Sequence, residues 1–389
     1  MITTEWLQQQ WSGGGWTSLI PPEFNGAWIP SALLPPGHGV LICSGGSRGG
    51  RRICLQPWEH LDRSAEATKR WLLDIGLHPA DCLLINPLPL HHVSGLMPWW
   101  RSRCWGGVHQ AVPRALMKDP SQLRQWSEAL PWWRERPALV SLVPTQLARL
   151  LGHPDGVAWL QACALIWIGG AALSPVLAQQ SRSLGLRLSP CYGSTETAAM
   201  VAALPPDHFL SGESSCGLPL TDTELRVASD GSLLVRTARL AQASWSEQQP
   251  DVLQKLRDAH GWWRSGDAAI LETGLTVLGR LDGAIHSGGE TVFPEQLETR
   301  LLHQAAETSL PQLPVLFLAE DDPEWGERLV ALVGASDEAV LRAFQQLTDA
   351  WPAAERPRRW LCCPHLTPSE TGKWRRDQWR RWLLCQQPS

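Results

Sequence analysis

The sequence predicts an α/β protein in which a large N-terminal domain of parallel-rich sheets flanked by helices precedes a smaller α+β domain. In the first half of the chain, short apolar runs that end at Gly, Pro or Ser alternate with longer helix-like segments. From about residue 215 the pattern becomes alternating apolar and polar residues, and later a mixture of helices and strands. These observations divide the chain into residues 1–281, with a small β-rich subdomain at 215–281, and residues 282–389.

Four apolar runs have the length and the flanking residues of buried strands. Residues 58–77 and 174–186 are typical of helices, and the second has Ser174 as its N-cap and Pro175 in its first turn. In parallel sheets, ligands bind at loops that follow the carboxyl ends of strands. The four runs are GVLICSGG (39–46), CLLINPLP (82–89), ALVSLVP (138–144) and ALIWIGG (164–170).

The C-terminal half begins with TELRVASDGSLLVRT (223–237), which alternates in polarity around Asp230-Gly231 and predicts a hairpin. After residue 282 we expect an α+β arrangement of two helices and two strands. The helices are predicted at 294–306 and 336–351, and the strands at 313–320 and 328–335.

Composition limits the class of protein. The chain has 389 residues, a net charge of −4, 43% apolar and 19% charged residues, which is typical of a globular protein and argues against nucleic acid as partner. Its ten cysteines include no C-x-x-C pair, which favours a reducing compartment. The N-terminus does not resemble a signal peptide, and the longest apolar stretch, 163–173, is too short to span a membrane. We therefore expect a cytoplasmic protein.

The stretch CSGGSRGGRR (43–52) follows a predicted strand and contains four glycines and three arginines. Glycines let backbone N–H groups converge on phosphate oxygens, and arginines add bidentate donors. The stretch lacks the Walker pattern, so it is either a phosphate loop of another kind or a solvated basic turn.

Four further stretches carry candidate chemistry, and each has a plainer alternative. CYGSTETAAM (191–200) offers an aromatic ring, a hydroxyl and a carboxylate suited to Mg²⁺, or else a capped helix start. The Asp of WWRSGDAAIL (262–271) suits ribose hydroxyls, or else is an Asp in a turn. GRLDGAIHSGGETVFPEQLE (279–298) is a loop-to-helix junction or a linker, and TPSETGKWRRDQW (367–379) presents one lysine in a Gly turn, or else a solvated charge run or a nucleic-acid patch.

Taken together, the order and spacing of these motifs resemble the adenylate-forming acyl-CoA synthetase superfamily, from about residue 38 to residue 380. PLPLHHVSGL, VPTQLARLL and GGAALSP resemble three lesser motifs of the same superfamily. The resemblance implies an ATP-dependent acid–thiol ligase with a small C-terminal domain that is mobile about a hinge at Asp282. Mg²⁺ would be the cofactor, and coenzyme A the second substrate.

The resemblance also implies residue roles. The phosphate loop would contain Arg48, Arg51 and Arg52 where the family has a hydroxyl residue, a proline and a lysine. Tyr192 would stack on adenine, Asp267 with Arg280 would bind the ribose, and Glu196 would hold Mg²⁺. The catalytic residues would be Lys373, Thr195 and Glu196. The remaining nucleotide-binding positions are Gly45, Gly46, Ser47, Gly49, Gly170 and Gly193.

The acid would lie against His92, Gly169 and Ser194, and CoA would enter along Ser287, Gly288 and Gly289. Among short members with a Gly-rich, Arg-bearing loop, the chain is most like the o-succinylbenzoate:CoA ligases of menaquinone and phylloquinone synthesis. Two alternatives remain open: another aryl- or fatty-acyl-CoA synthetase that forms AMP, or a non-catalytic nucleotide-binding homologue. The sequence leaves a homo-oligomer open.

Overall fold

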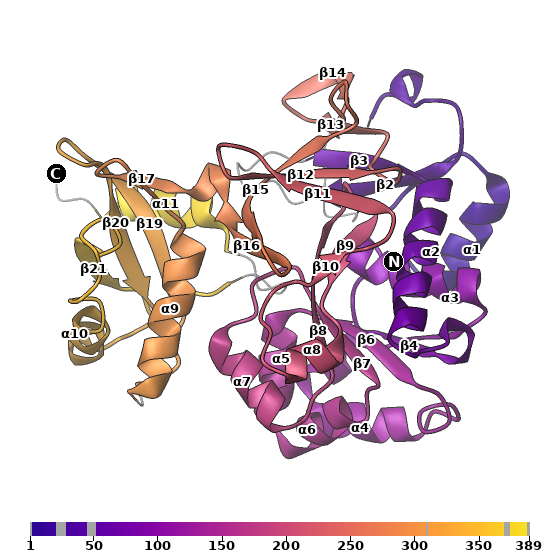
Figure 1. Ribbon diagram of the computed structural model, residues 1–389, viewed down its shortest axis with the longest axis horizontal. Coiled ribbons are helices and arrows are strands. Elements are labelled where there is room, and N and C mark those ends of the chain that lie inside the picture. Colours follow the sequence, from indigo (N-terminus) through magenta and orange to yellow (C-terminus); the bar gives the residue numbers. More distant parts are fainter. Residues whose placement is uncertain (1, 21–28, 45–51, 309, 369–373, 387–389) are drawn as a thin grey trace.

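The central element of the computed structural model is a seven-stranded sheet (Figure 1). The structure describes residues 2–20, 29–44, 52–308, 310–368 and 374–386. Strand order is β10-β9-β8-β7-β6-β4-β5; β5 to β8 pair in parallel, whereas β9 and β10 pair antiparallel. The strands are β4 (Leu83–Asn86), β5 (Val108–Ala111), β6 (Ala138–Leu142), β7 (Leu165–Ile168), β8 (Leu188–Ser194), β9 (Ala199–Ala203) and β10 (Leu218–Pro219).

Helices cover both faces of this sheet, which explains why its strands are apolar without alternation. On β7, Ile166 and Ile168 pack against one set of helices, while Leu165 and Trp167 pack on the opposite face. The first set is α4 (Pro120–Glu128), α5 (Pro144–Leu151), α6 (Pro154–Gln161), α7 (Pro175–Ser183) and α8 (Pro206–Leu210). The opposite face is covered by α2 (Trp58–Asp74) and α3 (Val93–Trp105), with α1 (Thr4–Gly13) packed beside them.

The predicted helix starts follow the expected chemistry. The Ser174 hydroxyl accepts a hydrogen bond from the Leu177 N–H at 3.3 Å, which confirms the N-cap of α7. Helices α4 to α8 each begin with proline, whose missing N–H costs nothing in the first turn. Short 3₁₀ turns connect other elements: η1 (Ser31–Leu33), η2 (Pro79–Asp81), η3 (Arg114–Lys118) and η4 (Leu281–Gly283).

The predicted strand at 39–46 does form, but in a different sheet. It is β2, which pairs antiparallel with β3. The predicted β-rich segment is divided between two sheets, because its middle part, residues 243–254, joins β3 instead of the sheet formed by the strands before and after it. This sheet contains β1 (Trp16–Ser18), β2 (Gly39–Ser44), β3 (Arg52–Pro57), β13 (Ala243–Ser246) and β14 (Gln249–Gln254).

A third, wholly antiparallel sheet has the order β11-β12-β15-β16. The hairpin predicted around Asp230-Gly231 is its β11–β12 connection. The strands are β11 (Thr223–Val227), β12 (Ser232–Thr237), β15 (Trp263–Leu271) and β16 (Leu275–Arg280).

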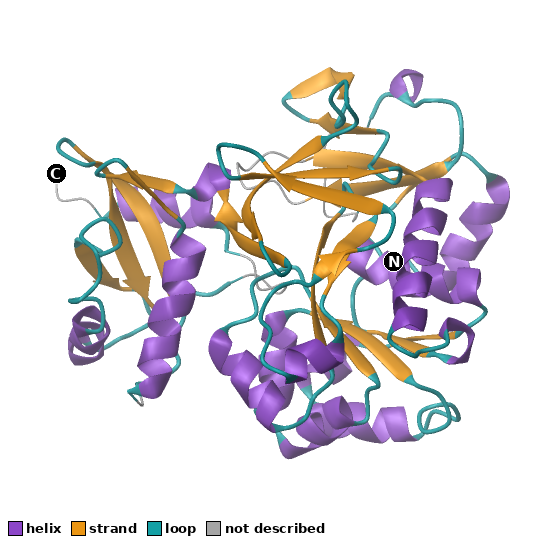
Figure 2. Cartoon of the chain, viewed as in Figure 1, coloured by secondary structure: helices purple, strands orange, loops and turns teal. Residues whose placement is uncertain are grey.

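Residues from Ile285 onward build a fourth sheet with its own apolar clusters on both faces. Figure 2 shows helices on either side of these strands. Strand order is β18-β17-β20-β19, and β21 pairs in parallel with β20. The elements are β17 (Ile285–Ser287), β18 (Glu290–Val292), α9 (Pro294–Glu307), β19 (Val315–Asp322), β20 (Gly326–Val333), α10 (Glu338–Gln346), β21 (Arg359–Cys362) and α11 (Arg376–Leu384).

The predicted α/β fold class is therefore confirmed. Within the described ranges, no helix is both long and apolar enough to cross a membrane.

One buried histidine makes stability depend on pH. His60 on α2 is 7% exposed, and burial, with Arg257 nearby, lowers its pKa to about 4. Glu59 opposes this shift and Arg63 adds to it. As pH falls below about 6.5, His60 binds a proton in the unfolded state but stays neutral in the folded state. The free energy of unfolding should therefore fall, by about 2 kcal/mol at pH 5 from this group.

The check is chemical denaturation of the wild type and of His60→Gln between pH 8 and pH 5. We expect the variant to lose less stability over this interval, whereas His78→Gln, at an exposed position, should follow the wild type. If the free energy of unfolding falls equally with pH in His60→Gln and in the wild type, His60 is not the group responsible.

Candidate functional site

The motif at 191–200 forms a tight strand–turn–strand connection between β8 and β9. Ala198 and Ala199 have φ of +51° and +86°, which side-chain-bearing residues rarely adopt. The Thr197 hydroxyl fixes the turn: it accepts from the Ser194 N–H at 3.0 Å and donates to the Ala199 carbonyl at 2.6 Å. The alternative of a capped helix start is therefore wrong.

Two buried side chains from distant parts of the chain hold this turn. Arg239 has no exposed side-chain surface; it pairs with Asp222 at 2.6 Å and donates to the carbonyls of Thr197 and Met200 at 2.5 and 2.9 Å. The Gln56 amide on β3 donates to the carbonyls of Thr195 and Glu196 at 2.7 and 3.1 Å. Sequence reasoning missed both, because their partners lie 42 and 140 residues away.

Glu196 lies against the strands that frame the glycine-rich loop. Glu196 is 8% exposed. The Cys54 thiol on β3 is buried, and this burial together with the nearby Glu196 carboxylate raises the pKa of the thiol. Ser44 and Arg52, the described residues on either side of the loop, pair with one another across β2 and β3 and also influence this thiol. The structure thus brings Glu196 close to both ends of the predicted phosphate loop.

The donor set fits Mg²⁺ in the manner usual for nucleotide enzymes. That ion is generally held by one or two carboxylates together with substrate phosphates, and Glu196 supplies one carboxylate. Over the described part of the chain, no group of three or more His, Cys, Asp or Glu side chains forms a metal site.

Tyr192, Asp267 and Arg280 form one hydrogen-bonded cluster. Asp267 on β15 lies opposite Arg280 on β16, and their side chains pair at 3.3 Å. The Tyr192 hydroxyl donates to the Asp267 carboxylate at 2.5 Å, and burial followed by the Asp267 charge raises the pKa of Tyr192 well above its usual value. Arg280 also pairs with Asp282 at 3.1 Å. A carboxylate has about four acceptor positions, so Asp267 retains capacity for a ribose hydroxyl.

The predicted acid-binding residues, and Gly170 of the predicted nucleotide-binding set, lie at or after the carboxyl ends of strands in the central sheet. Gly169 and Gly170 follow β7, and Gly170 has a φ of +81°. Ser194 ends β8, while His92 follows β4 and occupies the N-cap position of α3, its ring 4.5 Å from that of His91. A side chain at Gly169 would lie 3.1 Å from the Cys191 sulfur, so the β7 and β8 positions are close together.

Ser287, Gly288 and Gly289 occupy the β17–β18 hairpin. Gly288 has a φ of +60° and lies against the Trp325 ring, whereas Ser287 is buried. This hairpin belongs to the C-terminal sheet, whereas Asp267 lies in the sheet that contains β15 and β16. Arg52 is exposed at the first position of β3. The predicted residues Gly45, Gly46, Ser47, Arg48, Gly49 and Lys373 lie outside the described residues.

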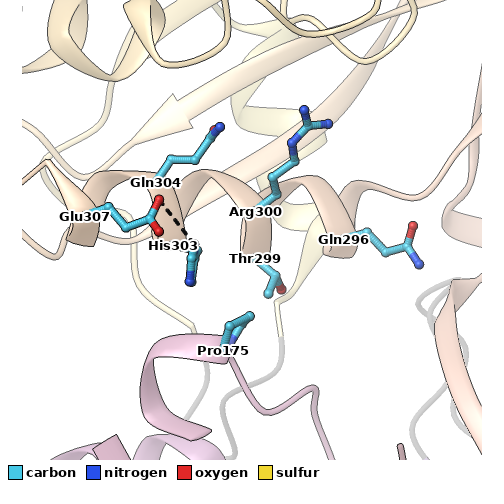
Figure 3. Close-up of a pocket in the computed structure, with 7 residues that line it drawn as sticks. All are labelled: Pro175, Gln296, Thr299, Arg300, His303, Gln304 and Glu307. Atoms are coloured by element: carbon cyan, nitrogen blue, oxygen red, sulfur yellow. Dashed lines mark ion pairs between the residues drawn. The ribbon is translucent and has the colours of Figure 1, made fainter. Parts of the chain in front are cut away.

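A groove lies between α9 and the start of α7 (Figure 3). Polar side chains of α9 face Pro175 across it, and His303 pairs with Glu307 at 3.6 Å. It contains none of the predicted site residues. The lining residues are Pro175, Gln296, Thr299, Arg300, His303, Gln304 and Glu307.

Arg101 is a further charged residue near the site, and the sequence analysis did not predict it. Arg101 on α3 is 3% exposed, lies over the rings of Trp105 and Trp167, and donates to the Thr68 hydroxyl at 3.0 Å. None of the ion pairs between described residues includes it, and burial lowers its pKa to about 9. Trp167 precedes Gly169 by two residues, and the Cys191 thiol also acts on Arg101, so this cation lies close beneath β7 and β8.

The closeness of β8 to β9 explains the glycine at 193. A Cβ there would lie 2.3 Å from the Ala199 carbonyl oxygen and from the Met200 Cα, so Gly193→Ala must displace the turn. We expect this variant to lower the free energy of unfolding by about 1–3 kcal/mol, as overpacking does. Gly152→Ala is the matched control, since a Cβ there meets nothing nearer than 3.5 Å. Thermal or urea unfolding of both variants makes the comparison; equal stabilities would contradict the close packing at Gly193.

Comparison with known proteins agrees with this geometry. The family model for AMP-binding enzymes matches residues 58–238. The chain is 30% identical to the 2-succinylbenzoate–CoA ligase of Escherichia coli K12 over 370 residues, covering 95% of this chain and 73% of that protein. The Salmonella typhimurium 2-succinylbenzoate–CoA ligase is 31% identical over 359 residues, which cover 92% and 70% of the two chains.

Solved structures show the same fold. Bacillus subtilis o-succinylbenzoate CoA synthetase in complex with the acyl-adenylate intermediate OSB-AMP matches with a TM-score of 0.72 and 23% identity, covering 88% of this chain and 68% of that one. Wild-type Escherichia coli MenE with a bound analogue of OSB-AMS matches with a TM-score of 0.64 and 28% identity, covering 93% and 71%. The chain belongs to the AMP-binding, adenylate-forming enzyme family.

Proposed function

We propose that this protein ligates o-succinylbenzoate to coenzyme A through an acyl-adenylate, releasing AMP and pyrophosphate, as a step of menaquinone or phylloquinone synthesis. The observation that carries the proposal is the cluster of Tyr192, Asp267 and Arg280 beside the Glu196 turn. It occurs in a chain that resembles 2-succinylbenzoate–CoA ligases over nearly its whole length.

In the first half-reaction, the acid attacks the α-phosphorus of ATP and pyrophosphate leaves. A carboxylate is a poor acyl donor, and the mixed anhydride with AMP gives it a good leaving group. Tyr192 would stack on adenine, Asp267 with Arg280 would accept and orient the ribose hydroxyls, and Thr195 would contact the phosphates. Charge develops on the phosphate oxygens, so cationic and N–H donors stabilise the transition state. Residues 45–52 and Lys373 would supply such donors, and Mg²⁺ held by Glu196 would add Lewis-acid stabilisation.

In the second half-reaction, the CoA thiol attacks the acyl carbonyl and AMP leaves. The same carbonyl must first be held beside Lys373 and then be open to the thiol, which favours a rotation of residues 282–389 about Asp282. The hairpin with Ser287, Gly288 and Gly289 would then line the pantetheine path. Acid specificity would arise from His92, Gly169 and Ser194.

The ten cysteines support a cytoplasmic location. All ten lie in the described ranges and none of them is in a disulfide; Cys104 and Cys385 are the two that are exposed. Free thiols persist in reducing compartments.

The role of Lys373 predicts a separation of the two half-reactions. Lys373→Ala should abolish adenylate formation from o-succinylbenzoate and ATP, yet leave thioester formation from preformed acyl-adenylate largely intact. Acid-dependent pyrophosphate release measures the first step, and CoA consumption with the isolated adenylate measures the second. Equal loss of both steps would refute the lysine's role. Pyrophosphate release with fatty acids and none with o-succinylbenzoate would refute the proposed substrate.

Arg101 makes no ion pair with another described residue, and we propose that it pairs with the ring carboxylate of this dianion. A buried cation without a counter-ion is costly, and a substrate carboxylate would compensate it. Arg101→Gln should lower kcat/KM for o-succinylbenzoate at least tenfold more than kcat/KM for the analogue in which hydrogen replaces the ring carboxylate.

Steady-state kinetics with both acids on one enzyme preparation gives this ratio, which is independent of the fraction of folded protein. Equal losses for both acids would show that Arg101 serves the fold alone.

A further inference from the structure

A buried ion cluster connects two helices of the C-terminal sheet unit. The Arg376 guanidinium, at the first position of α11, donates to both Glu298 carboxylate oxygens at 3.0 and 3.1 Å. It also pairs with Glu295, one turn earlier on α9, at 3.1 Å. Side-chain exposure is 13% for Arg376, 8% for Glu298 and 30% for Glu295, so the first two groups are removed from water.

Strand β19 completes the cluster. The Phe317 carbonyl accepts from Arg376 at 2.7 Å, and the Phe317 N–H donates to Glu298 at 2.8 Å. One guanidinium is therefore held by oxygens from α9 and β19 in a fixed, forked arrangement that a lysine could not reproduce.

The same cluster reaches the turn that carries the ribose-binding arginine. A Cβ on Gly279 would lie 2.8 Å from one Glu295 carboxylate oxygen, and a Cβ on Gly283 would lie 3.8 Å from the other. Gly279 has a φ of +152°. Glu295 thus lies between Arg376 and the segment that contains Arg280 and Asp282.

Arg376 follows Lys373 by three residues, and three residues of chain span at most about 11 Å. We infer that Arg376 is a positioning residue for the adenylation half-reaction: clamped by Glu295 and Glu298, it fixes the start of α11 beside the Gly279–Gly283 turn and so limits where Lys373 can act. This inference rests on the proposed function. The clamp should matter for the step that uses Lys373 and not for the step in which the thiol reacts.

The test compares Arg376→Gln and Arg376→Lys with the wild type in both half-reactions, using o-succinylbenzoate, ATP and isolated acyl-adenylate. For Arg376→Gln we expect the rate of adenylation at saturating ATP to fall at least tenfold, with KM for ATP within about twofold. Thioester formation on the same preparation should stay within about twofold. Arg376→Lys keeps the charge without the fork and should recover part of the adenylation rate.

Arg359→Gln is the matched control, because Arg359 pairs with Glu320 at 2.5 Å in the same sheet unit but lies on β21. It should leave both half-reactions near wild type. Equal loss of both half-reactions in Arg376→Gln, or unchanged adenylation, would overturn the inference. If Arg376→Gln fails to fold, the same two outcomes are read from Arg376→Lys. Equal loss of both steps in Lys373→Ala would instead refute the role proposed for that lysine, and no adenylation by the wild type would refute the proposed function.

Discussion

The ion pair between Arg239 and Asp222 is the interaction on which the geometry of the site depends. The Arg239 side chain is buried, and it also donates hydrogen bonds to the carbonyls of Thr197 and Met200. Two alanines in this turn have positive φ, and each such conformation costs about 1–3 kcal/mol. Charge-assisted hydrogen bonds of about 1.5–3 kcal/mol each are of the right size to offset that cost. Together with Gln56 and the Thr197 hydroxyl, Arg239 therefore holds the turn that positions Glu196.

Three sheets meet at this turn, and each contributes one part of the proposed chemistry. The central sheet provides Tyr192 and Thr195, the β2–β3 hairpin frames Glu196, and the β15–β16 hairpin provides Asp267 with Arg280. A nucleotide has three parts that differ in chemistry: an aromatic base, a diol and a charged phosphate chain. A junction where edges of three sheets meet can hold these parts rigidly, which is the preorganisation that charge stabilisation requires.

Local sequence patterns predicted the elements better than their partners. The buried strands at 82–89, 138–144 and 164–170 and the N-cap at Ser174 follow from apolar runs and capping chemistry within a few residues. The helix alternative at 195 was wrong because tertiary hydrogen bonds from Gln56 and Arg239 decide that turn. The pairing of β13 with β3 was missed for the same reason, since the partners lie far apart in the chain. Arg101 belongs to no sequence motif. Only the structure distinguishes it, as a buried arginine that makes no ion pair with a described carboxylate.

Arg280 gives the proposed rotation a physical connection to the nucleotide. It pairs with Asp267, the proposed ribose ligand, and with Asp282, the proposed hinge residue, through different guanidinium nitrogens. A turn about Asp282 would therefore disturb a residue that also orients Asp267. Arg280 is 40% exposed, and pairs with this exposure contribute only about 1 kcal/mol or less. Such a pair can break and re-form in each catalytic cycle, whereas the buried clamp at Arg376 lies within the C-terminal unit and can remain intact while that unit moves.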